Sequence, residues 1–510
     1  MVTLSLLHFL SLLFIILYLL TFLRILITAV TSAATAAADA DANADSEHKS
    51  YPFIGSLISF HRNRTRLIHW FTDLLSRSAS QTVVLRRLGR RTNQMIVTAN
   101  PANVEHILKT NFENYPKGKP FTDLLGDFLG IGIFNVDGEL WSTQRKLASH
   151  EFSTRSLREF VAGVVDDVIA NRLVPLLEDA VVNNGVLDMQ DVLRRLAFDT
   201  ISLISLGHDP CCLDYSKPVP ALVTSFDVAA GASAMRGVAP ANWVWKLKRF
   251  FSLGSERRLK AAVRVVHRSV DDIIRQRRRQ MADGDGTENQ RDLLSRFISA
   301  GHGDELVRDM AISFLMAGRD TTSAAMTWLF WLLTWHPTVE TKLLTELTQN
   351  HHPSLNFEDL KKMDYLKACL CESMRLYPPV VWDSKHAEKD DVLPDGTPVF
   401  GGNRVMYFPY GMGRMESLWG KDCLEFRPDR WFSEPDGFFK MESPYKFPVF
   451  QSGPRVCLGK EMAFVQMKSV VGAILSRFEL VPVCEGEPVF VPLLTAHMKG
   501  GFKVRVRRRN

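Results

Sequence analysis

The chain of 510 residues has few cysteines and only a small excess of charge. Its seven cysteines are an odd number without a Cys-x-x-Cys pair, which argues against a disulfide framework and a structural zinc site. Such sparse cysteine is typical of a reduced compartment. The net charge of +6 is too small to indicate nucleic-acid binding. It fits an acidic protein partner and an anionic membrane surface equally well.

Long hydrophobic runs are also scarce, with one exception at the N-terminus. Residues 4–23 are almost entirely apolar. Twenty residues at about 1.5 Å each span about 30 Å, the hydrocarbon thickness of a bilayer. A cleaved signal peptide is the alternative, but its apolar region is shorter and follows basic residues, and here no Lys or Arg precedes Arg24. We therefore predict an uncleaved, single-pass anchor in residues 1–30, with a cytoplasmic body behind it.

The rest of the chain divides into a linker and one globular body. Residues 31–50 are rich in Ala and Asp and have too little apolar surface to pack, so we predict a linker. Residues 51–510 show mostly helical periodicity, for example at Leu306, Met310 and Phe314. Strand-like segments occur at 83–88, 95–98, 399–408 and 502–507. The prediction is a mainly α fold with small β-sheets.

The most specific pattern is a glycine-rich loop around one cysteine: Phe450-x-x-Gly453-x-Arg455-x-Cys457-x-Gly459. A thiolate ligand must point from a tight loop, where glycines allow unusual backbone angles and close approach to a flat cofactor. Backbone N–H groups and a following helix N-terminus stabilise the negative sulfur, and an arginine suits a carboxylate of the cofactor. A merely buried cysteine leaves the other four positions unexplained. The loop resembles the haem-thiolate loop of cytochromes P450.

A second pattern is Glu372-x-x-Arg375, whose side chains share one helix face. Such a pair alone is common on surfaces, but here a Pro-Pro turn follows it, and Arg427 and Arg430 lie downstream. This resembles the P450 network in which a third arginine locks the pair. The resemblance favours Arg430 over Arg427 as that member and implies a structural role.

The third pattern, Ala-Gly-Arg-Asp-Thr-Thr at residues 317–322, lies inside a long helical pattern at 306–333. One interpretation is a glycine kink with threonine hydroxyls bonded to the preceding turn. An acid followed by a threonine is also what oxygen activation requires, because the two groups pass protons to the distal oxygen. The run is similar to the oxygen-activation motif of P450s, which implies that Asp320 and Thr321 are catalytic and that the helix is distorted there.

The fourth pattern is Trp141-x-x-x-Arg145, which places an indole and a guanidinium on one helix face. Alone it is more often a surface arginine beside a core tryptophan. With the other three motifs in the family's order, it resembles the partners of a haem propionate. Lys385 and His386 are further candidates for that contact.

Taken together, these motifs indicate the cytochrome P450 fold from about residue 51 to residue 507. The resemblance implies haem b, with Cys457 as the metal ligand and Phe450, Gly453, Arg455, Gly459, Trp141 and Arg145 around the cofactor. It also implies a monooxygenase on the endoplasmic reticulum membrane that faces the cytosol. Electrons from NADPH would come through a separate NADPH–cytochrome P450 reductase, since the chain has no dinucleotide fingerprint.

Four further strings are similar to plant ω-hydroxylases of fatty acids: residues 114–118, 382–387, 390–396 and 408–415. Residues 382–386 (WDSKH) most resemble the branch that ω-hydroxylates jasmonoyl-isoleucine. The leading hypothesis is therefore jasmonoyl-L-isoleucine 12-hydroxylation in jasmonate catabolism, with free medium- or long-chain fatty acids as the alternative substrates. A haem-binding sensor without turnover is an alternative from another class. Lys117, Lys119 and Arg236 are candidate anchors for the substrate carboxylate.

Overall fold

The computed structural model describes residues 55–86, 94–153, 155–237, 242–283, 292–349, 357–433, 437–483 and 486–509. Two compact units divide the chain, residues 1–67 with 85–93 and residues 68–84 with 94–510. In the first unit, helix α2 (Leu57–Arg62) follows Ser56, whose backbone N–H donates to the Arg86 carbonyl at 2.9 Å. The predicted anchor and linker lie outside the described residues. Among the helices that are described, none has the length and apolar content needed to cross a bilayer.

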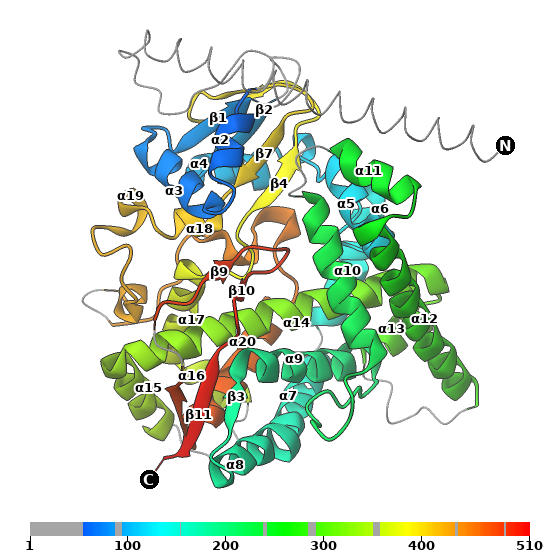
Figure 1. Cartoon of the computed structure of the whole chain (residues 1–510), viewed down its shortest axis with the longest axis vertical. Helices are drawn as coiled ribbons and strands as arrows, with labels where there is room; N and C mark the ends of the chain where they lie inside the picture. The colour runs from blue at the N-terminus through cyan, green and yellow to red at the C-terminus, as the bar shows by residue number, and fades with distance from the viewer. Residues whose placement is uncertain are drawn as a thin grey trace, which may run out of the picture. The chain divides into compact units, whose positions relative to one another are not determined.

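Helices dominate the second unit, which confirms the predicted mainly helical fold (Figure 1). Its α-helices are α3 (Leu67–Arg77), α4 (Pro101–Glu105), α5 (Lys119–Leu129), α6 (Gly138–Ser153), α7 (Arg155–Val168), α8 (Val174–Val182), α9 (Met189–Leu206), α10 (Ala221–Gly237), α11 (Asn242–Phe250), α12 (Gly254–Ala282), α13 (Leu293–Ser299), α14 (Asp304–Trp335), α15 (Pro337–Gln349), α16 (Phe357–Lys362), α17 (Asp364–Leu376), α18 (Pro409–Met412), α19 (Glu416–Trp419) and α20 (Lys460–Leu475). Two π-helical turns, η1 (His106–Thr110) and η3 (Ile169–Leu173), and four 3₁₀ turns, η2 (Phe112–Asn114), η4 (Pro428–Trp431), η5 (Pro448–Phe450) and η6 (Gly453–Arg455), complete the helical set.

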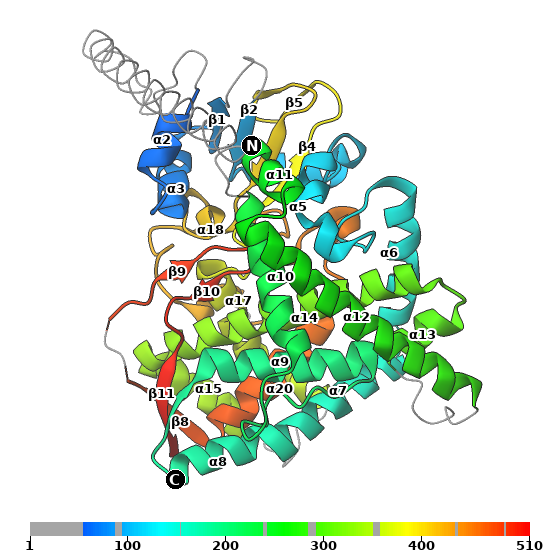
Figure 2. The ribbon, with the colours of Figure 1, turned by 45° about the vertical axis from the view of Figure 1, so that its right-hand side comes forward.

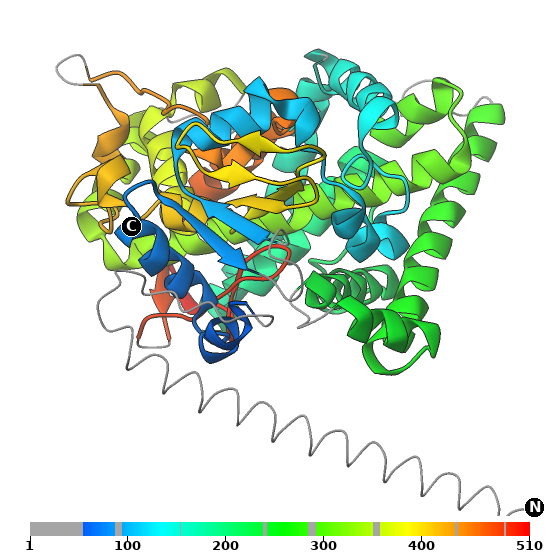
Figure 3. The ribbon, with the colours of Figure 1, turned by 90° about the horizontal axis from the view of Figure 1, so that it is seen from above.

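The strands form small sheets. They are β1 (Thr82–Arg86), β2 (Gln94–Thr98), β3 (Val186–Asp188), β4 (Asp383–His386), β5 (Asp391–Val392), β6 (Pro398–Val399), β7 (Arg404–Tyr407), β8 (Phe478–Pro482), β9 (Phe490–Val491), β10 (His497–Met498) and β11 (Lys503–Arg508). One sheet has the order β1-β2-β7-β4, with β7 parallel to β2 and antiparallel to β4. Figure 3 shows the blue β2 in one layer with the yellow β7 and β4.

Two strand predictions have different outcomes. The predicted alternation at the C-terminus is confirmed, because Val504 and Val506 of β11 are buried while Lys503, Arg505 and Arg507 are exposed. The predicted single strand 399–408 is wrong in part. It is divided into β6 and β7 by a turn in which Gly402 has φ +85°. That left-handed conformation favours glycine and interrupts an extended strand.

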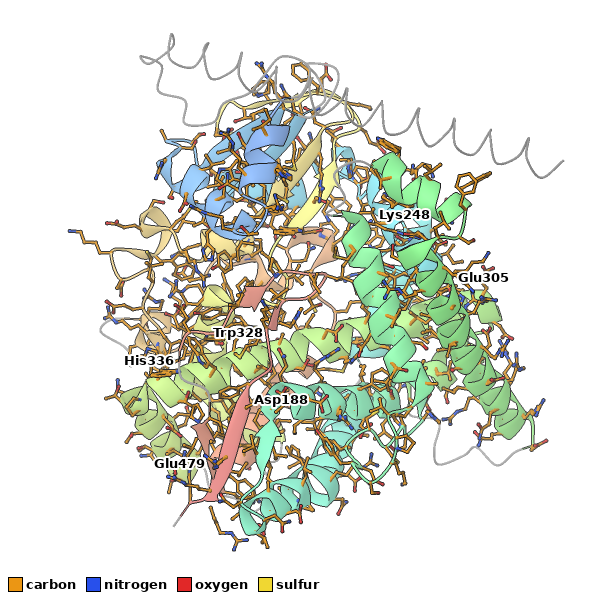
Figure 4. The ribbon with its side chains drawn as sticks, viewed as in Figure 1. Asp188, Lys248, Glu305, Trp328, His336 and Glu479 are labelled. Atoms are coloured by element: carbon orange, nitrogen blue, oxygen red, sulfur yellow. The ribbon has the colours of Figure 1, made fainter. Side chains whose placement is uncertain are left out.

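Helix α14 is the central element of the second unit. Asp304 and Glu305 lie in its first turn, where negative charge is favourable, and most of the helix is buried. Figure 4 labels Trp328 within the helix and His336 at its end. The Trp328 ring stacks on Tyr377 of the segment after α17, with centroids 4.2 Å apart. This stack packs the C-terminal half of α14 against the segment that follows α17.

Gly318 allows α14 to approach α9 closely. A Cβ atom at this position would lie 2.5 Å from Cδ1 of Ile201, closer than carbon atoms pack. The helix is uninterrupted through residues 304–335, so no break accompanies the predicted distortion. The glycine therefore serves helix packing in this structure.

Candidate functional site

The loop before α20 presents Cys457. Its backbone N–H donates to the Phe450 carbonyl at 2.8 Å, which closes the loop. Gly453 has φ +66°, and a Cβ atom there would overlap the carbonyl oxygen of Leu108. Gly459 is the N-cap of α20, so the sulfur lies beside the positive end of a 16-residue helix. The two glycines thus serve different purposes: Gly453 permits the tight turn against Leu108, and Gly459 begins the helix.

The Cys457 side chain is exposed, although protein surrounds it closely. Burial raises the pKa of its thiol, while the Gly459 N–H, Arg145 and Lys460 favour the thiolate. A side chain that is both accessible and strongly desolvated faces an enclosed space and not bulk solvent. Such an environment suits a sulfur that binds a buried cation.

We expect Gly453→Ala to destabilise the fold by about 2 kcal/mol or more. The left-handed backbone costs about 1–2 kcal/mol for an L-residue, and the overlap with Leu108 adds to that. Denaturant unfolding measures the change. Gly459→Ala is the matched control, because its φ is −85° and the nearest atom to its added Cβ is a Phe152 ring carbon at 3.9 Å. Equal stability of the two variants would contradict the proposed role of Gly453.

Positive side chains gather near this loop. The Arg455 guanidinium lies 4.3 Å from the Trp141 ring centroid and donates to Asp137 Oδ1 at 2.7 Å. Burial lowers the pKa of Arg145, which is within electrostatic range of Cys457. No ion pair of Arg145 or Lys117 with a carboxylate occurs among the described residues. The structure thus brings Trp141, Arg145 and Arg455 to one region, as the motifs predict.

Lys117 is the most unusual of these cations. It is 7% exposed, and its ammonium lies 4.5 Å from the Phe121 ring centroid. Burial, with smaller contributions from Lys385 and Arg455, lowers its pKa to about 7. An anionic group beside it would stabilise its charged form. The sequence suggested Lys117 as an anchor for the substrate carboxylate. Its proximity to Arg455 became apparent only from the folded structure.

The string Trp-Asp-Ser-Lys-His at 382–386 forms a buried polar network. Asp383 Oδ2 accepts from Lys385 Nζ at 2.9 Å, from Gln451 Nε2 at 2.5 Å and from Tyr407 Oη at 3.1 Å. Although burial opposes it, Lys385 and Lys117 lower the pKa of Asp383. His386 Nδ1 lies 2.6 Å from the Lys117 carbonyl oxygen. Lys385 and His386, predicted as cofactor contacts, thus bond to protein groups, and Lys385 shares Asp383 with Gln451 of the cysteine loop.

A fully buried network surrounds Glu372. Its carboxylate receives Arg375 through two bonds of 2.8 Å, Arg430 Nε at 2.8 Å and Trp431 Nε1 at 3.0 Å. The side chain of Arg427 turns instead to Asp422, and only its backbone N–H reaches Glu372, at 3.0 Å. The geometry therefore gives Arg430 the position of the third arginine.

Asp320 and Thr321 lie on α14, which packs against α20. Thr321 Oγ1 donates to the Ala317 carbonyl at 2.6 Å, and Thr322 Oγ1 donates to the Gly318 carbonyl at 2.5 Å. Asp320 Oδ1 lies 3.5 Å from Arg319 Nε. The helix thus holds a half-buried hydroxyl and a carboxylate on consecutive residues, which can relay protons.

Comparison with known proteins decides the family. Residues 46–498 match the family model "Cytochrome P450". The chain belongs to the cytochrome P450 family. It is 60% identical to cytochrome P450 94B1 of Arabidopsis thaliana over 470 residues, which cover 91% of this chain and 92% of that protein. Cytochrome P450 94B3 of Arabidopsis thaliana is also 60% identical (90% and 92% covered), and cytochrome P450 94A1 of Vicia sativa is 46% identical (91% and 90%).

A solved structure has the same fold at low sequence identity. The cytochrome P450DA heme domain aligns with a TM-score of 0.75 and 21% identity, covering 91% of this chain and 97% of that one. The resemblance predicted from the motifs is therefore confirmed, and the chain is a cytochrome P450 monooxygenase. Its residues fit a haem: Cys457 faces an enclosed space, Gly453 permits the tight loop, and Lys117 and Arg145 are cations suited to propionates.

Proposed function

We propose that this P450 hydroxylates the terminal carbon of an alkyl chain in a small carboxylic acid, with jasmonoyl-L-isoleucine as substrate and C-12 as the site of attack. The resemblance of residues 382–386 to that branch carries the substrate, and 60% identity to two 94B proteins supports it. Free medium- or long-chain fatty acids are the second candidate, because the other three strings resemble fatty-acid ω-hydroxylases.

The cofactor in this proposal is haem b, whose iron the Cys457 thiolate would bind. When bound, the haem supplies O₂ activation and insertion of one oxygen atom into an unactivated C–H bond. Trp141, Arg145, Arg455 and Lys117 would hold its carboxylates, and Phe450, Gly453 and Gly459 shape the cysteine loop. Lys117 then serves the cofactor and not the substrate.

The other two candidate anchors for the substrate already have acidic partners. Lys119 pairs with Asp123 at 2.8 Å on the surface. Arg236 is buried, and it bonds Glu256 Oε2 at 2.5 Å and Asp127 Oδ2 at 2.7 Å. Burial of these paired charges favours a structural role for Arg236 in joining α10, α5 and α12. The structure therefore offers no support for Lys119 or Arg236 as the anchor of the substrate carboxylate.

Electrons come from NADPH through the reductase in this proposal, at a basic surface near the cysteine loop. Lys460 at the start of α20 suits that surface. Lys468, a basic residue further along α20, does not suit it: it is 5% exposed, and its Nζ donates to the Leu360 carbonyl at 2.7 Å. Burial lowers its pKa to about 8. Charge reversal at Lys460 tests the surface by its effect on reduction by the reductase.

Asp320 and Thr321 manage proton delivery. We expect Thr321→Ala to keep haem binding but to lower product formed per NADPH by about tenfold or more, because loss of one proton donor removes part of a general-acid contribution. Product and NADPH oxidation, measured together, give the coupling. Thr322→Ala is the matched control, since its hydroxyl is buried and bonded to Gly318. Tight coupling in Thr321→Ala would count against the proton role.

Product analysis tests the substrate. Membranes that contain the full chain and reductase are supplied with NADPH and either jasmonoyl-isoleucine or a panel of fatty acids. We expect the 12-hydroxylated conjugate as the main product. Hydroxylated fatty acids alone would favour the second candidate, and ligand-induced spectra without NADPH-dependent oxygen use would favour a sensor.

The location proposed is the endoplasmic reticulum membrane, with residues 1–30 as a single-pass anchor, residues 31–50 as linker and the catalytic domain in the cytosol. The 20-residue apolar run supports the anchor. Protease added to sealed microsomes should digest the body while the membrane is intact. Protection of the body would place it in the lumen and overturn this orientation.

A further inference from the structure

A cavity of about 200 Å³ lies beside α14. Its wall includes seven polar side chains, from α9, α10, α14 and residues 493–497: Gln190, Arg194, Asp227, Asp320, Ser323, Thr495 and His497. In Figures 1 and 2, α9, α10 and β10 lie next to α14. The cavity therefore contains the carboxylate of the predicted catalytic pair in its wall.

Charged groups on three helices converge on this cavity. Asp227 Oδ1 accepts from Arg194 Nη2 at 2.7 Å and pairs with Arg319 Nη2 at 2.6 Å. Arg319 is 2% exposed, and its Nε and Nη1 have no hydrogen-bond partner among the described residues. Buried donors of this kind require water or an anion. The neighbouring cavity has room for several water molecules, which its polar side chains can bind.

His497 of β10 adds a group that exchanges protons near neutral pH. Burial and Arg194 lower the pKa of its imidazole, and Asp320 raises it. The charged groups that line the cavity with it come from three helices: Arg194 of α9, Asp227 of α10 and Asp320 of α14. Arg319 of α14 acts on the cavity only through its pair with Asp227. The protonation of His497 therefore depends on both Asp320 and Arg194.

We propose that this cavity is the entrance for the protons used in oxygen activation, and that His497 passes them from cavity water to Asp320. The inference rests on the monooxygenase activity described above. Each turnover uses O₂, two electrons and two protons; one oxygen enters the substrate and the other leaves as water. The His497 imidazolium gives its N–H proton to the Asp320 carboxylate, Asp320 passes it towards Thr321, and neutral His497 takes another proton from water. His497 is a relay residue that acts through Asp320.

The first test is His497→Gln in the full-length holoenzyme, with His208→Gln as the matched control. His208 is an exposed histidine beyond the end of α9 and does not line the cavity. We expect His497→Gln to lower the rate of product formation about tenfold and to raise its solvent isotope effect. The reduced CO complex should be unchanged. With hydrogen peroxide in place of O₂ and NADPH, His497→Gln and the parent enzyme should form product at the same rate, because peroxide supplies both protons.

A titration of His497 by NMR gives a readout that is independent of turnover and of the substrate. Asp320→Asn should lower the pKa of His497 further, and Arg194→Gln should raise it. Unchanged titration in both variants, or parental rate and isotope effect in His497→Gln, would overturn the relay. Absence of any hydroxylated acid from the parent enzyme would refute the proposed substrates and leave the titration result standing.

A second variant alters the cavity without changing an ionisable group. Gly231 of α10 lines the cavity, and nothing lies within 4 Å of an added Cβ atom there, so Gly231→Leu places a side chain in open space. We expect it to raise the solvent isotope effect as His497→Gln does. Gly163→Leu on α7 is the matched control, because that helical glycine also has open space around it but does not line the cavity. A parental isotope effect in Gly231→Leu would contradict the cavity as the proton route.

Discussion

Replacement of Cys457 by serine or histidine should abolish the band at about 450 nm of the reduced CO complex, together with all product formation. In the proposed site the Cys457 sulfur would be the ligand that gives this band, and neither oxygen nor imidazole donates charge as a thiolate does. The loop geometry does not depend on the side chain, since it is closed by the Cys457 N–H bond to Phe450 and by the conformation of Gly453. The folded body should therefore remain.

The absorption spectrum of the reduced CO complex and the far-ultraviolet circular dichroism measure these two outcomes separately. Cys211→Ser is the matched control, because that cysteine is half-buried, free, and far from the loop in sequence. It should keep the band. Retention of the band in Cys457→Ser would mean that another residue binds the iron, and the ligand assignment would then be wrong.

Arg375→Ala should destabilise the fold by about 3–5 kcal/mol. Glu372 and Arg375 are fully buried. Removal of the guanidinium leaves the buried negative charge of Glu372 with only part of its hydrogen bonds and ion pairs. The same guanidinium donates to the carbonyl oxygens of Cys423 at 2.6 Å and Glu425 at 2.9 Å. These carbonyl oxygens would lose their donor as well. A buried acceptor without a hydrogen bond costs about 1–3 kcal/mol of stability.

Chemical denaturation of the variants measures the loss. Arg427→Ala is the matched control: its guanidinium pairs with Asp422, but the side chain is 55% exposed. Exposed pairs contribute at most about 1 kcal/mol, so this variant should be nearly neutral. Arg430→Ala should fall between the two, because Glu372 keeps Arg375 and Trp431. If Arg375→Ala and Arg427→Ala were equally stable, the buried network would not be the source of stability.

The four motifs could be predicted from sequence because each is local. The loop glycines, the Glu372–Arg375 spacing and the Asp320–Thr321 pair are set by residues within one turn or one loop. Their resemblance to cytochromes P450 also supplied the third arginine. The structure adds the contacts that distinguish Arg430 from Arg427, which the sequence offers as near neighbours.

The charged residues were harder to place, because pairing depends on partners that are distant in the chain. Arg236 bonds Asp127, 109 residues away, and Lys468 bonds the Leu360 carbonyl, 108 residues away. Neither partner is marked by any pattern. Gln451 reaches Asp383 across 68 residues, so the network beneath residues 382–386 was likewise not predictable.

The sequence by itself determined the family, the helical class and the motif residues, and it predicted the cysteine ligand. It could do so because short-range spacing controls helix faces and tight turns. Only the tertiary structure decided which cations are paired, that Lys117 is buried beside aromatic rings, and that Asp320 shares a cavity with His497. The physical reason is that desolvation and ion pairing depend on distance in space. Residues from α9, α10, α14 and β10 meet around this cavity only after the chain has folded.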